Sequence, residues 1–401
     1  MRFASRLAAL ALLLFAAPAF PVTFTKVADA ATLGWLPENT TFGAPALDAG
    51  VVAFRAFENL AGHVGIFTGS GGPLTPVADS TTLIPGQSFG WLFDPSISGG
   101  SVAFVGNDEN YYPAVYTNLG GTLSRIAEIG MPDPDGGGTL QPADGLVSIH
   151  GANVAFLAYH EYGYPGLYTS VAGALERTAD ETTPLPDGDS TTYLDGPPSL
   201  DATGIAFAAF SGSVAGVYVA NAGVVRVVAD TNTSAPGGDG TFLAFDRASI
   251  ASDSGNTVFA AVAANGGGLY AEIGGALTKV SDELILGESI SGADVAWHAQ
   301  SSALLGDPDG YAGLYLLHEG RRIPVIEAGD PLDGRVVEDF ELGREALSGD
   351  QLAFTAYFED GTQGVYVAAI PEPGSTAQLC AGCVALSALA LPAAATQLST
   401  M

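Results

Sequence analysis

Positive charge is scarce in this 401-residue chain. Lys and Arg together number 13 against 43 Asp and Glu, so the formal net charge is −30, and the two lysines are Lys26 and Lys279. Proteins that bind nucleic acid rely on Lys and Arg to displace the counterions of the phosphate backbone. The charge balance therefore excludes nucleic acid and anionic membrane surfaces as expected partners.

Cysteine is nearly absent, and its two copies, Cys380 and Cys383, lie close to the C-terminus. The rest of the chain therefore has no disulfide, thiolate nucleophile or cysteine-ligated metal. There is also no H-E-x-x-H or P-loop motif, and the five histidines never fall at a metal-ligand spacing. No catalytic residue is predicted from the sequence.

The first 19 residues have the pattern of a secretory signal peptide. Arg2 and Arg6 precede an apolar run, residues 7–16, and Ala17-Pro18-Ala19 provides a small-x-small cleavage site. We expect export and a mature N-terminus near Phe20. A retained N-terminal anchor is the alternative, although the apolar run is shorter than the roughly 20 residues of a membrane-spanning helix.

The other end of the chain carries a second targeting pattern. Pro371, Glu372 and Pro373 precede a mostly apolar stretch, residues 377–395. A Pro-Glu-Pro step before a terminal apolar helix resembles the PEP-CTERM sorting signal of Gram-negative bacteria. The resemblance covers residues 371–401 and implies a transmembrane helix, an exosortase-type processing enzyme as partner, and a location at the outer cell surface or in the extracellular matrix.

This tail departs from the PEP-CTERM pattern in one respect. The Arg-rich cluster usual at the extreme C-terminus is missing, and residues 393–401 read AAATQLSTM. A positive cluster should hold the tail on the cytoplasmic side of the membrane. The alternative is therefore an apolar tail that is not processed.

Between these ends, residues 20–370 repeat with a period near fifty. Three short strings recur seven times in a fixed order: an apolar-Ala-aromatic triplet such as residues 52–54, a small-apolar-aromatic triplet such as residues 65–67, and a string ending in an acid such as residues 77–79. The first acid-ended copy, residues 27–29, precedes the first triplet, and none follows Tyr366. The series is therefore offset by one strand.

Each repeat has four strand-length segments and many glycine turns, as a β-propeller blade does. We predict an all-β fold: a seven-bladed β-propeller of about 50-residue, four-stranded blades. The offset predicts that the N-terminal strand, Thr23 to Asp29, closes the ring beside the strand around Gly364 to Val367. The body resembles exported bacterial tandem-repeat proteins that carry this Gly-x-Tyr pattern.

Tyrosines in two consecutive repeats are the best candidates for ligand binding. Tyr111 and Tyr112 lie between the first and second strings of one repeat, and Tyr159, Tyr162 and Tyr164 lie at the same place in the next. Tyrosine offers a flat apolar face with a polar tip, which suits stacking on a sugar ring. We predict a polysaccharide-binding surface here; local packing of long hairpins is the alternative.

Acidic Gly- and Pro-rich loops follow several of the acid-ended strings. Asp133 and Asp135 lie in one such loop, and Asp187 and Asp189 in the next. Clustered carboxylates with turn carbonyls are ligands that Ca²⁺ prefers. We therefore consider a Ca²⁺ site, against the alternative that aspartate here only stabilises turns.

The combined prediction is an exported, non-enzymatic protein that binds extracellular polysaccharide or a surface partner through its propeller loops. Two alternatives stay open: a propeller polysaccharide hydrolase or lyase, and a purely structural matrix component. His150, Arg247 and Glu341 differ from their counterparts in the other repeats. They are therefore the residues to inspect for a catalytic site.

Overall fold

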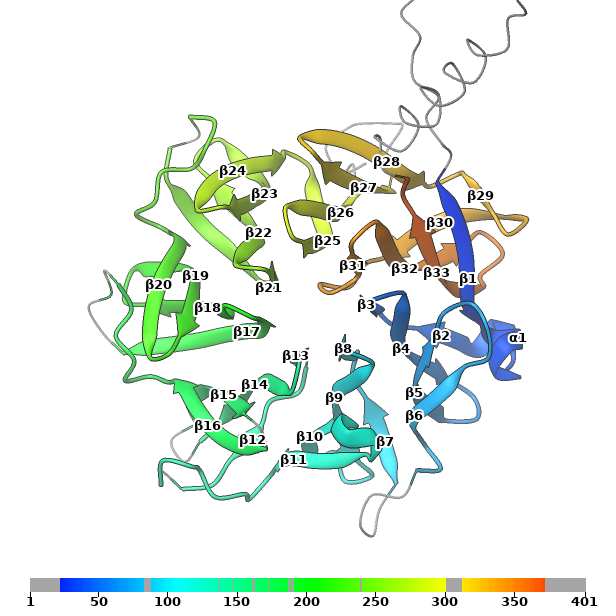
Figure 1. Ribbon diagram of the computed structural model, residues 1–401, viewed down its shortest axis with the longest axis horizontal. Helices are drawn as coiled ribbons and strands as arrows, with labels where there is room; N and C mark the ends of the chain where they lie inside the picture. The colour runs from blue at the N-terminus through cyan, green and yellow to red at the C-terminus, as the bar shows by residue number, and fades with distance from the viewer. Residues whose placement is uncertain are drawn as a thin grey trace, which may run out of the picture. The chain divides into compact units, whose positions relative to one another are not determined.

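The computed structural model describes residues 22–371 except 83–87, 137, 146, 161–162, 172, 187, 189–190, 239 and 301–311. Residues 23–369 form one unit of seven antiparallel sheets around a central axis (Figure 1). The predicted seven-bladed β-propeller is confirmed. The predicted signal peptide and the tail from Glu372 onward, including Pro373, lie outside the described residues, of which Pro371 is the last.

The first three blades follow one another along the chain. Blade 1 contains β2 (Thr40–Phe42), β3 (Ala46–Asp48), β4 (Val51–Glu58), β5 (His63–Gly69) and β6 (Thr75–Asp79). Blade 2 contains β7 (Phe89–Leu92), β8 (Ser96–Ser98), β9 (Ser101–Asp108), β10 (Pro113–Thr117) and β11 (Ser124–Glu128). Blade 3 contains β12 (Gln141–Pro142), β13 (Ser148–His150), β14 (Asn153–Tyr159), β15 (Pro165–Val171) and β16 (Ala174–Ala179).

In blades 4 to 6 the innermost strand is continuous, so each sheet has four strands. Blade 4 contains β17 (Thr192–Asp201), β18 (Gly204–Ser211), β19 (Val214–Asn221) and β20 (Val224–Asp230). Blade 5 contains β21 (Phe242–Asp253), β22 (Asn256–Ala263), β23 (Gly266–Ile273) and β24 (Ala276–Ser281). Blade 6 contains β25 (Leu284–Ser291), β26 (Asp294–Gln300), β27 (Ala312–His318) and β28 (Arg321–Glu327).

Blade 7 joins the two ends of the described chain. It contains β29 (Pro331–Leu332), β30 (Arg335–Glu341), β31 (Leu347–Ser348), β32 (Gln351–Phe358) and β33 (Gln363–Ala369), with β1 (Thr23–Asp29) as its outermost strand. β1 pairs antiparallel with β33 from Thr23 opposite Ala369 to Asp29 opposite Gly364. The predicted closure by the N-terminal strand is confirmed.

Helical structure in the described ranges is limited to short pieces. The helix α1 (Ala30–Leu33) follows β1, and the two 3₁₀ turns are η1 (Pro37–Asn39) and η2 (Leu119–Gly121). Asp29 caps α1 by accepting a 2.8 Å hydrogen bond from the Thr32 N–H. Within the described part of the chain, no helix has the length and apolar character needed to cross a membrane.

The apolar-Ala-aromatic triplet is explained by burial of both faces of each sheet. Val52, Ala53 and Phe54 are all fully buried. Val52 and Phe54 pack towards blade 7, whereas Ala53 packs on the other side against Phe104 of blade 2. The alanine is small because it receives the large aromatic ring of the next blade. This contact recurs with alanine in five of the described inter-blade cores, whereas Val258 replaces the alanine opposite Trp297 between blades 5 and 6.

The Gly-x-aromatic string lies on the neighbouring strand, and its ring pairs with the triplet aromatic. Phe54 opposes Phe67, with ring centroids 5.9 Å apart, and Phe156 and Tyr168 repeat the contact at 6.0 Å. The glycine is needed because the ring two residues later folds over it: a Cβ at Gly65 would lie 2.5 Å from the Phe67 ring.

Candidate functional site

At the inner end of each blade, a turn connects the innermost strand to the second strand. Side-chain hydrogen bonds between successive turns form a belt around the axis. The face of the ring that carries these turns is called the turn face below. At six of the seven junctions, a side chain of one blade accepts a hydrogen bond from a backbone N–H in the turn of the next. The acceptors are Asp48, Ser98, Asp201, Asp253, Ser291 and Ser348. This belt explains why Asp or Ser ends most innermost strands.

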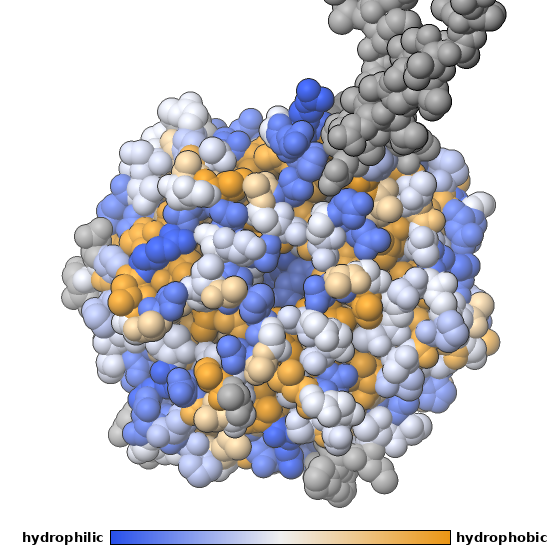
Figure 2. Space-filling model, in the orientation of Figure 1, coloured by the Kyte–Doolittle hydropathy of each residue, from blue (hydrophilic) through white to orange (hydrophobic). Residues whose placement is uncertain are grey.

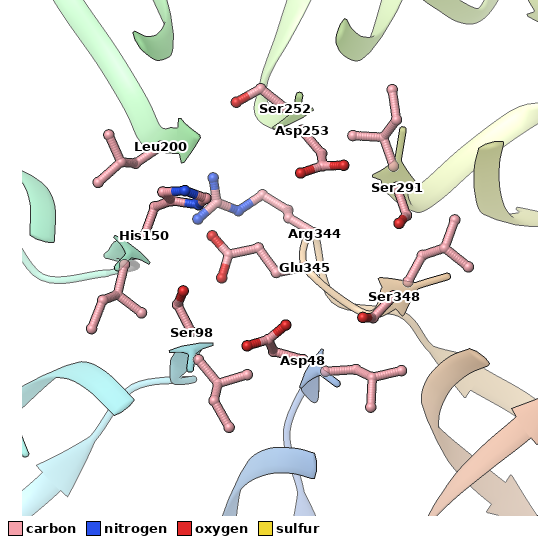
Figure 3. A pocket seen from close by; sticks show the side chains of 15 residues that line it. Asp48, Ser98, His150, Leu200, Ser252, Asp253, Ser291, Arg344, Glu345 and Ser348 are labelled. Carbon is pink, nitrogen blue, oxygen red and sulfur yellow. The ribbon is translucent and has the colours of Figure 1, made fainter. Parts of the chain in front are cut away.

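His150 occupies the seventh position of the belt. Within the described residues, it makes no such bond to blade 4. Its side chain instead lines the central cavity, as does that of Arg344 (Figure 3). Arg344 and its neighbour Glu345 come from the segment between β30 and β31 of blade 7.

Arg344 and Glu345 connect blade 7 to blades across the axis. Glu345 accepts a hydrogen bond of 2.6 Å from the Ser148 hydroxyl of blade 3 and another from the Ser96 hydroxyl of blade 2. Nη1 of Arg344 donates to the backbone carbonyls of Pro198 at 2.9 Å and Ile250 at 3.3 Å, in blades 4 and 5. Burial raises the pKa of Glu345, against the opposing effect of Arg344 and the two serines. The pair therefore ties five blades together.

A cavity of about 150 Å³ lies on the turn-face side of this pair. It is lined by polar side chains and by a ring of aliphatic side chains (Figure 3). The polar side chains include Asp48, His150, Asp253 and Arg344. A smaller cavity of about 30 Å³, lined partly by Asp94, also contacts Arg344 and Glu345. Figure 2 shows the centre of the ring as a hollow lined mainly by hydrophilic residues.

The three residues that deviate from the repeat do not meet in one place. His150 lines the central cavity, whereas Arg247 forms an ion pair with Asp195. Glu341 accepts a hydrogen bond of 2.6 Å from the Tyr357 hydroxyl. Burial raises the pKa of Glu341, more than the hydrogen bond from Tyr357 lowers it. No shared catalytic constellation follows from these positions.

Tyr111, Tyr112, Tyr159 and Tyr164 lie on the face opposite the turns, where loops such as residues 59–62 and 109–112 connect the second and third strands. This face is called the loop face below. Tyr111 is 77% exposed and Tyr112 53% exposed. The buried carboxylate of Asp108 fixes their loop by accepting hydrogen bonds from the N–H groups of Asn110 and Tyr112. Both rings therefore extend into solvent from an anchored backbone.

Two of the predicted tyrosines of blade 3 are also exposed. Tyr159 is 38% and Tyr164 40% exposed, while Tyr162 lies outside the described residues. The buried ring of His160 holds this loop through a 2.8 Å contact of Nε2 with Glu181. Within the described residues, no ring contact joins Tyr111, Tyr112, Tyr159 and Tyr164. They form separate exposed positions on one face, not one packed cluster.

The acidic loop of blade 3 uses its carboxylates to bind arginine. Asp133 is buried, and its Oδ2 lies 3.5 Å from Nη1 of Arg177, while Nε of Arg177 donates to Asp135 at 2.8 Å. Asp187 and Asp189 lie outside the described residues. Among the residues that the structure describes, no group of three or more metal-ligating side chains is placed to hold an ion. The Ca²⁺ site stays a prediction.

Aromatic residues recur at the loop-face ends of the second strands, and among them Tyr159 alone belongs to the residues predicted from the sequence to bind a ligand. In four blades the triplet continues into a longer pattern, apolar-Ala-aromatic-x-Ala-aromatic. The second aromatic of this pattern is not buried with the first. Its copies are Phe57, Tyr159, Phe210 and Tyr357. The longer repeat was the signal that could have identified them.

Comparison with known proteins bears on the chain's relationships. Residues 26–307, more than half of the chain, match the model of a family of unknown function (DUF7453). The chain belongs to that family. The matched residues end before β29 and so do not include Arg344 and Glu345. No curated protein matches the chain.

Similar solved structures are propellers with low sequence identity. A puromycin-hydrolysing peptidase of Mycobacterium tuberculosis has a TM-score of 0.52 at 11% identity, over 89% of this chain and 55% of the peptidase. The β-propeller domain of the trilobed protease from Pyrococcus furiosus, described as having an open velcro topology, has a TM-score of 0.50 at 10% identity, over 82% of this chain and 95% of that domain. Such similarity establishes the fold and leaves the function open.

Proposed function

We propose that the chain is an exported, non-enzymatic protein that binds extracellular polysaccharide through the loop face of its propeller. The observation that carries the proposal is the conformation of Tyr111. Its backbone has φ of +63°, in the left-handed region, and the residue is 77% exposed. The left-handed conformation costs about 1–2 kcal/mol for a residue with a Cβ, and an exposed ring recovers none of that by packing.

A strained, exposed aromatic residue is a reason to look for function. The loop could use Gly at this position without strain, as many other turns of this chain do. Tyr112 and, in the next blade, Tyr159 and Tyr164 offer further exposed rings on the same face. Several weak stacking contacts can together give firm attachment to a repeating polymer.

The test separates stability from binding. Tyr111→Gly should raise the melting temperature by relieving the backbone and should weaken retention on polysaccharide. Ala222→Gly is the matched control, because Ala222 also has a positive φ, of +48°, and is exposed in the β19–β20 turn on the turn face. It should stabilise the protein and leave binding unchanged. Unchanged binding of Tyr111→Gly and of a Tyr112→Ala variant to every retained polysaccharide would contradict the tyrosine proposal.

Export and sorting are parts of the same proposal. Mass spectrometry of protein from the native host should find an N-terminus near Phe20. The sorting motif, Pro371-Glu372-Pro373, predicts that peptides after about Pro373 are missing from the surface form. A full-length protein in the cytoplasm would contradict both expectations, whereas retention of the tail alone would indicate that the missing Arg cluster prevents exosortase processing.

A polysaccharide hydrolase or lyase is the second candidate. Glu341 favours it, because a carboxyl whose pKa is raised can act as a general acid, and Asp94 and Arg55 lie close enough to influence that pKa. Release of reducing ends or unsaturated sugars from a bound polysaccharide, lost in Glu341→Gln, would establish catalysis. Binding without release over the same period would support the non-enzymatic function.

A further inference from the structure

Near the loop-face end of each blade, the residue three positions after the triplet aromatic lies directly opposite a residue of the innermost strand, which gives seven equivalent pairs. Five of these seven pairs include an aromatic residue: Thr41–Phe57, Trp91–Asn107, Gln141–Tyr159, Tyr193–Phe210 and Asp339–Tyr357. In blade 4 both partners are aromatic. We call these six aromatic residues the collar.

The collar differs from the other repeated aromatics in burial. Triplet aromatics such as Phe54 and Phe207 are at most 1% exposed, whereas all six collar residues keep exposed surface. They stand on paired strands, not on flexible loops, so their positions are fixed by the sheets. Aromatic groups held at strand ends and open to solvent are suited to binding a flat apolar ligand surface.

The collar residues of blades 3 and 4 form a row of flat groups with Arg247 of blade 5. Tyr193 and Phe210 have ring centroids 5.0 Å apart, and the guanidinium of Arg247 lies 5.3 Å from the Phe210 centroid. Tyr159 continues the row towards blade 3, because β14 packs against β17. Burial raises the pKa of Tyr159, and Tyr193 and Asp195 raise it further, as expected for close neighbours.

Polar groups stand along the same row. Arg247 forms an ion pair with Asp195 of the neighbouring blade and still has 57% of its side chain exposed. Asp144 is exposed nearby and also acts on the pKa of Tyr159. A sugar ring has an apolar C–H face and a rim of hydroxyls, so it can stack on the rings while its hydroxyls bond to the carboxylates and the guanidinium.

We propose that Tyr159, Tyr193 and Phe210, with Arg247 and Asp195 beside them, form a subsite for a neutral polysaccharide. This inference rests on the proposed function and names both the site and the ligand class. The class follows from charge: the chain carries a net charge of −30, and Asp144 and Asp195 flank the row, so a polyuronate would be repelled. Arg247 does not reverse this, because Asp195 neutralises it.

The equivalent part of the collar in blades 1 and 2 is more enclosed. Phe57 and Trp91 have centroids 5.0 Å apart, and Arg55 lies 5.2 Å from the Trp91 centroid while it pairs with Asp94 at 2.8 Å. The Arg55 side chain is only 18% exposed, against 57% for Arg247. Trp91 therefore provides a matched aromatic site that we expect to contribute less.

The experiment measures retention of the purified chain on curdlan and cellulose, which are neutral, and on agarose-coupled alginate, a polyuronate. We expect retention on at least one neutral polymer and none on alginate at low salt. Tyr193→Ala and Phe210→Ala should each weaken binding about 3- to 10-fold, the range expected for one aromatic stacking contact. Tyr193→Phe should keep binding, and Trp91→Ala should change it less than 2-fold.

The possible outcomes test the collar subsite separately from the proposed function. Retention on a neutral polymer that Tyr193→Ala and Phe210→Ala leave intact, while Tyr111→Gly reduces it, would overturn the collar subsite and keep the proposed function. Retention on alginate alone would overturn the neutral class. Retention on none of the polymers would overturn both proposals. Thermal unfolding of each variant excludes loss of fold as the cause, and Tyr193→Phe gives a stacking-competent variant if Tyr193→Ala fails to fold.

Discussion

Glu345 accepts a hydrogen bond of 2.6 Å from the hydroxyl of Ser148, although the two residues belong to blades on opposite sides of the axis. The same carboxylate accepts from Ser96, and the Ser96 and Ser148 oxygens in turn accept from the backbone N–H groups of Ile149 and Leu200. A side chain of blade 7 thus completes a network in blades 2, 3 and 4. Ring closure depends on this contact as well as on β1.

We therefore expect Glu345→Ala to destabilise the propeller. The substitution leaves two buried serines without their acceptor and removes the carboxylate with the largest electrostatic effect on Arg344, which should cost about 3 kcal/mol. Urea unfolding, monitored by fluorescence, measures the change in the free energy of unfolding. Glu176, which is exposed on β16, gives the control: Glu176→Ala should stay within about 0.5 kcal/mol of the parent. Equal effects of the two variants would show that Glu345 is not a structural tie.

A second prediction concerns the alanine of the triplet. Ala155 is fully buried in the same core cluster as Phe207 of the next blade. Leucine has no room there, so Ala155→Leu should lower the free energy of unfolding by about 1–3 kcal/mol. Ala174→Leu, at an exposed position of β16 in the same blade, should have little effect. A neutral Ala155→Leu would show that the blades can separate to admit a larger side chain.

A third prediction tests closure by β1. Val27 is 3% exposed and packs with residues of blade 7 and blade 1. Val27→Asp places an unpaired carboxylate in that core and should lower the melting temperature by several degrees. Lys26→Ala changes an exposed neighbour on the same strand and should be nearly neutral. If Val27→Asp and deletion of residues 23–29 both left the melting temperature unchanged, closure by β1 would be wrong.

The period of the repeat and the closure of the ring by β1 could be predicted because short strings of similar residues recur along the chain. Each blade solves the same packing problem, so the same residue types recur at Val52, Ala53 and Phe54 and at their counterparts. The offset of the acid-ended string then required a strand from the start of the chain. The short repeated strings and the order of the strands in the seven sheets therefore predict the same fold.

The axial tie could not be predicted in the same way. Glu345 and Ser148 are 197 residues apart in the sequence. They come into contact because the inner ends of the blades converge on the central axis. A signal did exist, because blades 1, 2 and 4 carry Pro45, Pro95 and Pro198 where blade 7 carries Glu345. Whether that acid was catalytic, exposed or structural depended on its partners across the axis. The strain at Tyr111 was likewise a property of the backbone, not of residue type.

Glu288 of blade 6 shares the position of Glu345 and is the residue from which we expect a pH dependence. It is 1% exposed; Oε2 accepts a hydrogen bond from Ser249, and Oε1 has no partner within the described residues. Burial raises its pKa to about 7 from an ordinary value of 4.5, and the hydrogen bond from Ser249 opposes the shift. Asp246 raises the pKa further, whereas Arg344 lowers it.

Because the folded pKa lies above the unfolded one, the stabilising contribution of the protonated carboxyl is fully present below pH 4.5 and is lost as pH rises through about 7. Glu288→Gln keeps the shape and cannot ionise. It should therefore remove this part of the pH dependence and stabilise the protein at pH 8 by roughly 3 kcal/mol, since each pKa unit corresponds to about 1.4 kcal/mol. Urea midpoints at pH 5, 6, 7 and 8 measure it, with Glu176→Gln as the exposed control. Parallel pH curves for the parent and Glu288→Gln would show that Glu288 ionises in the folded state as freely as in the unfolded one.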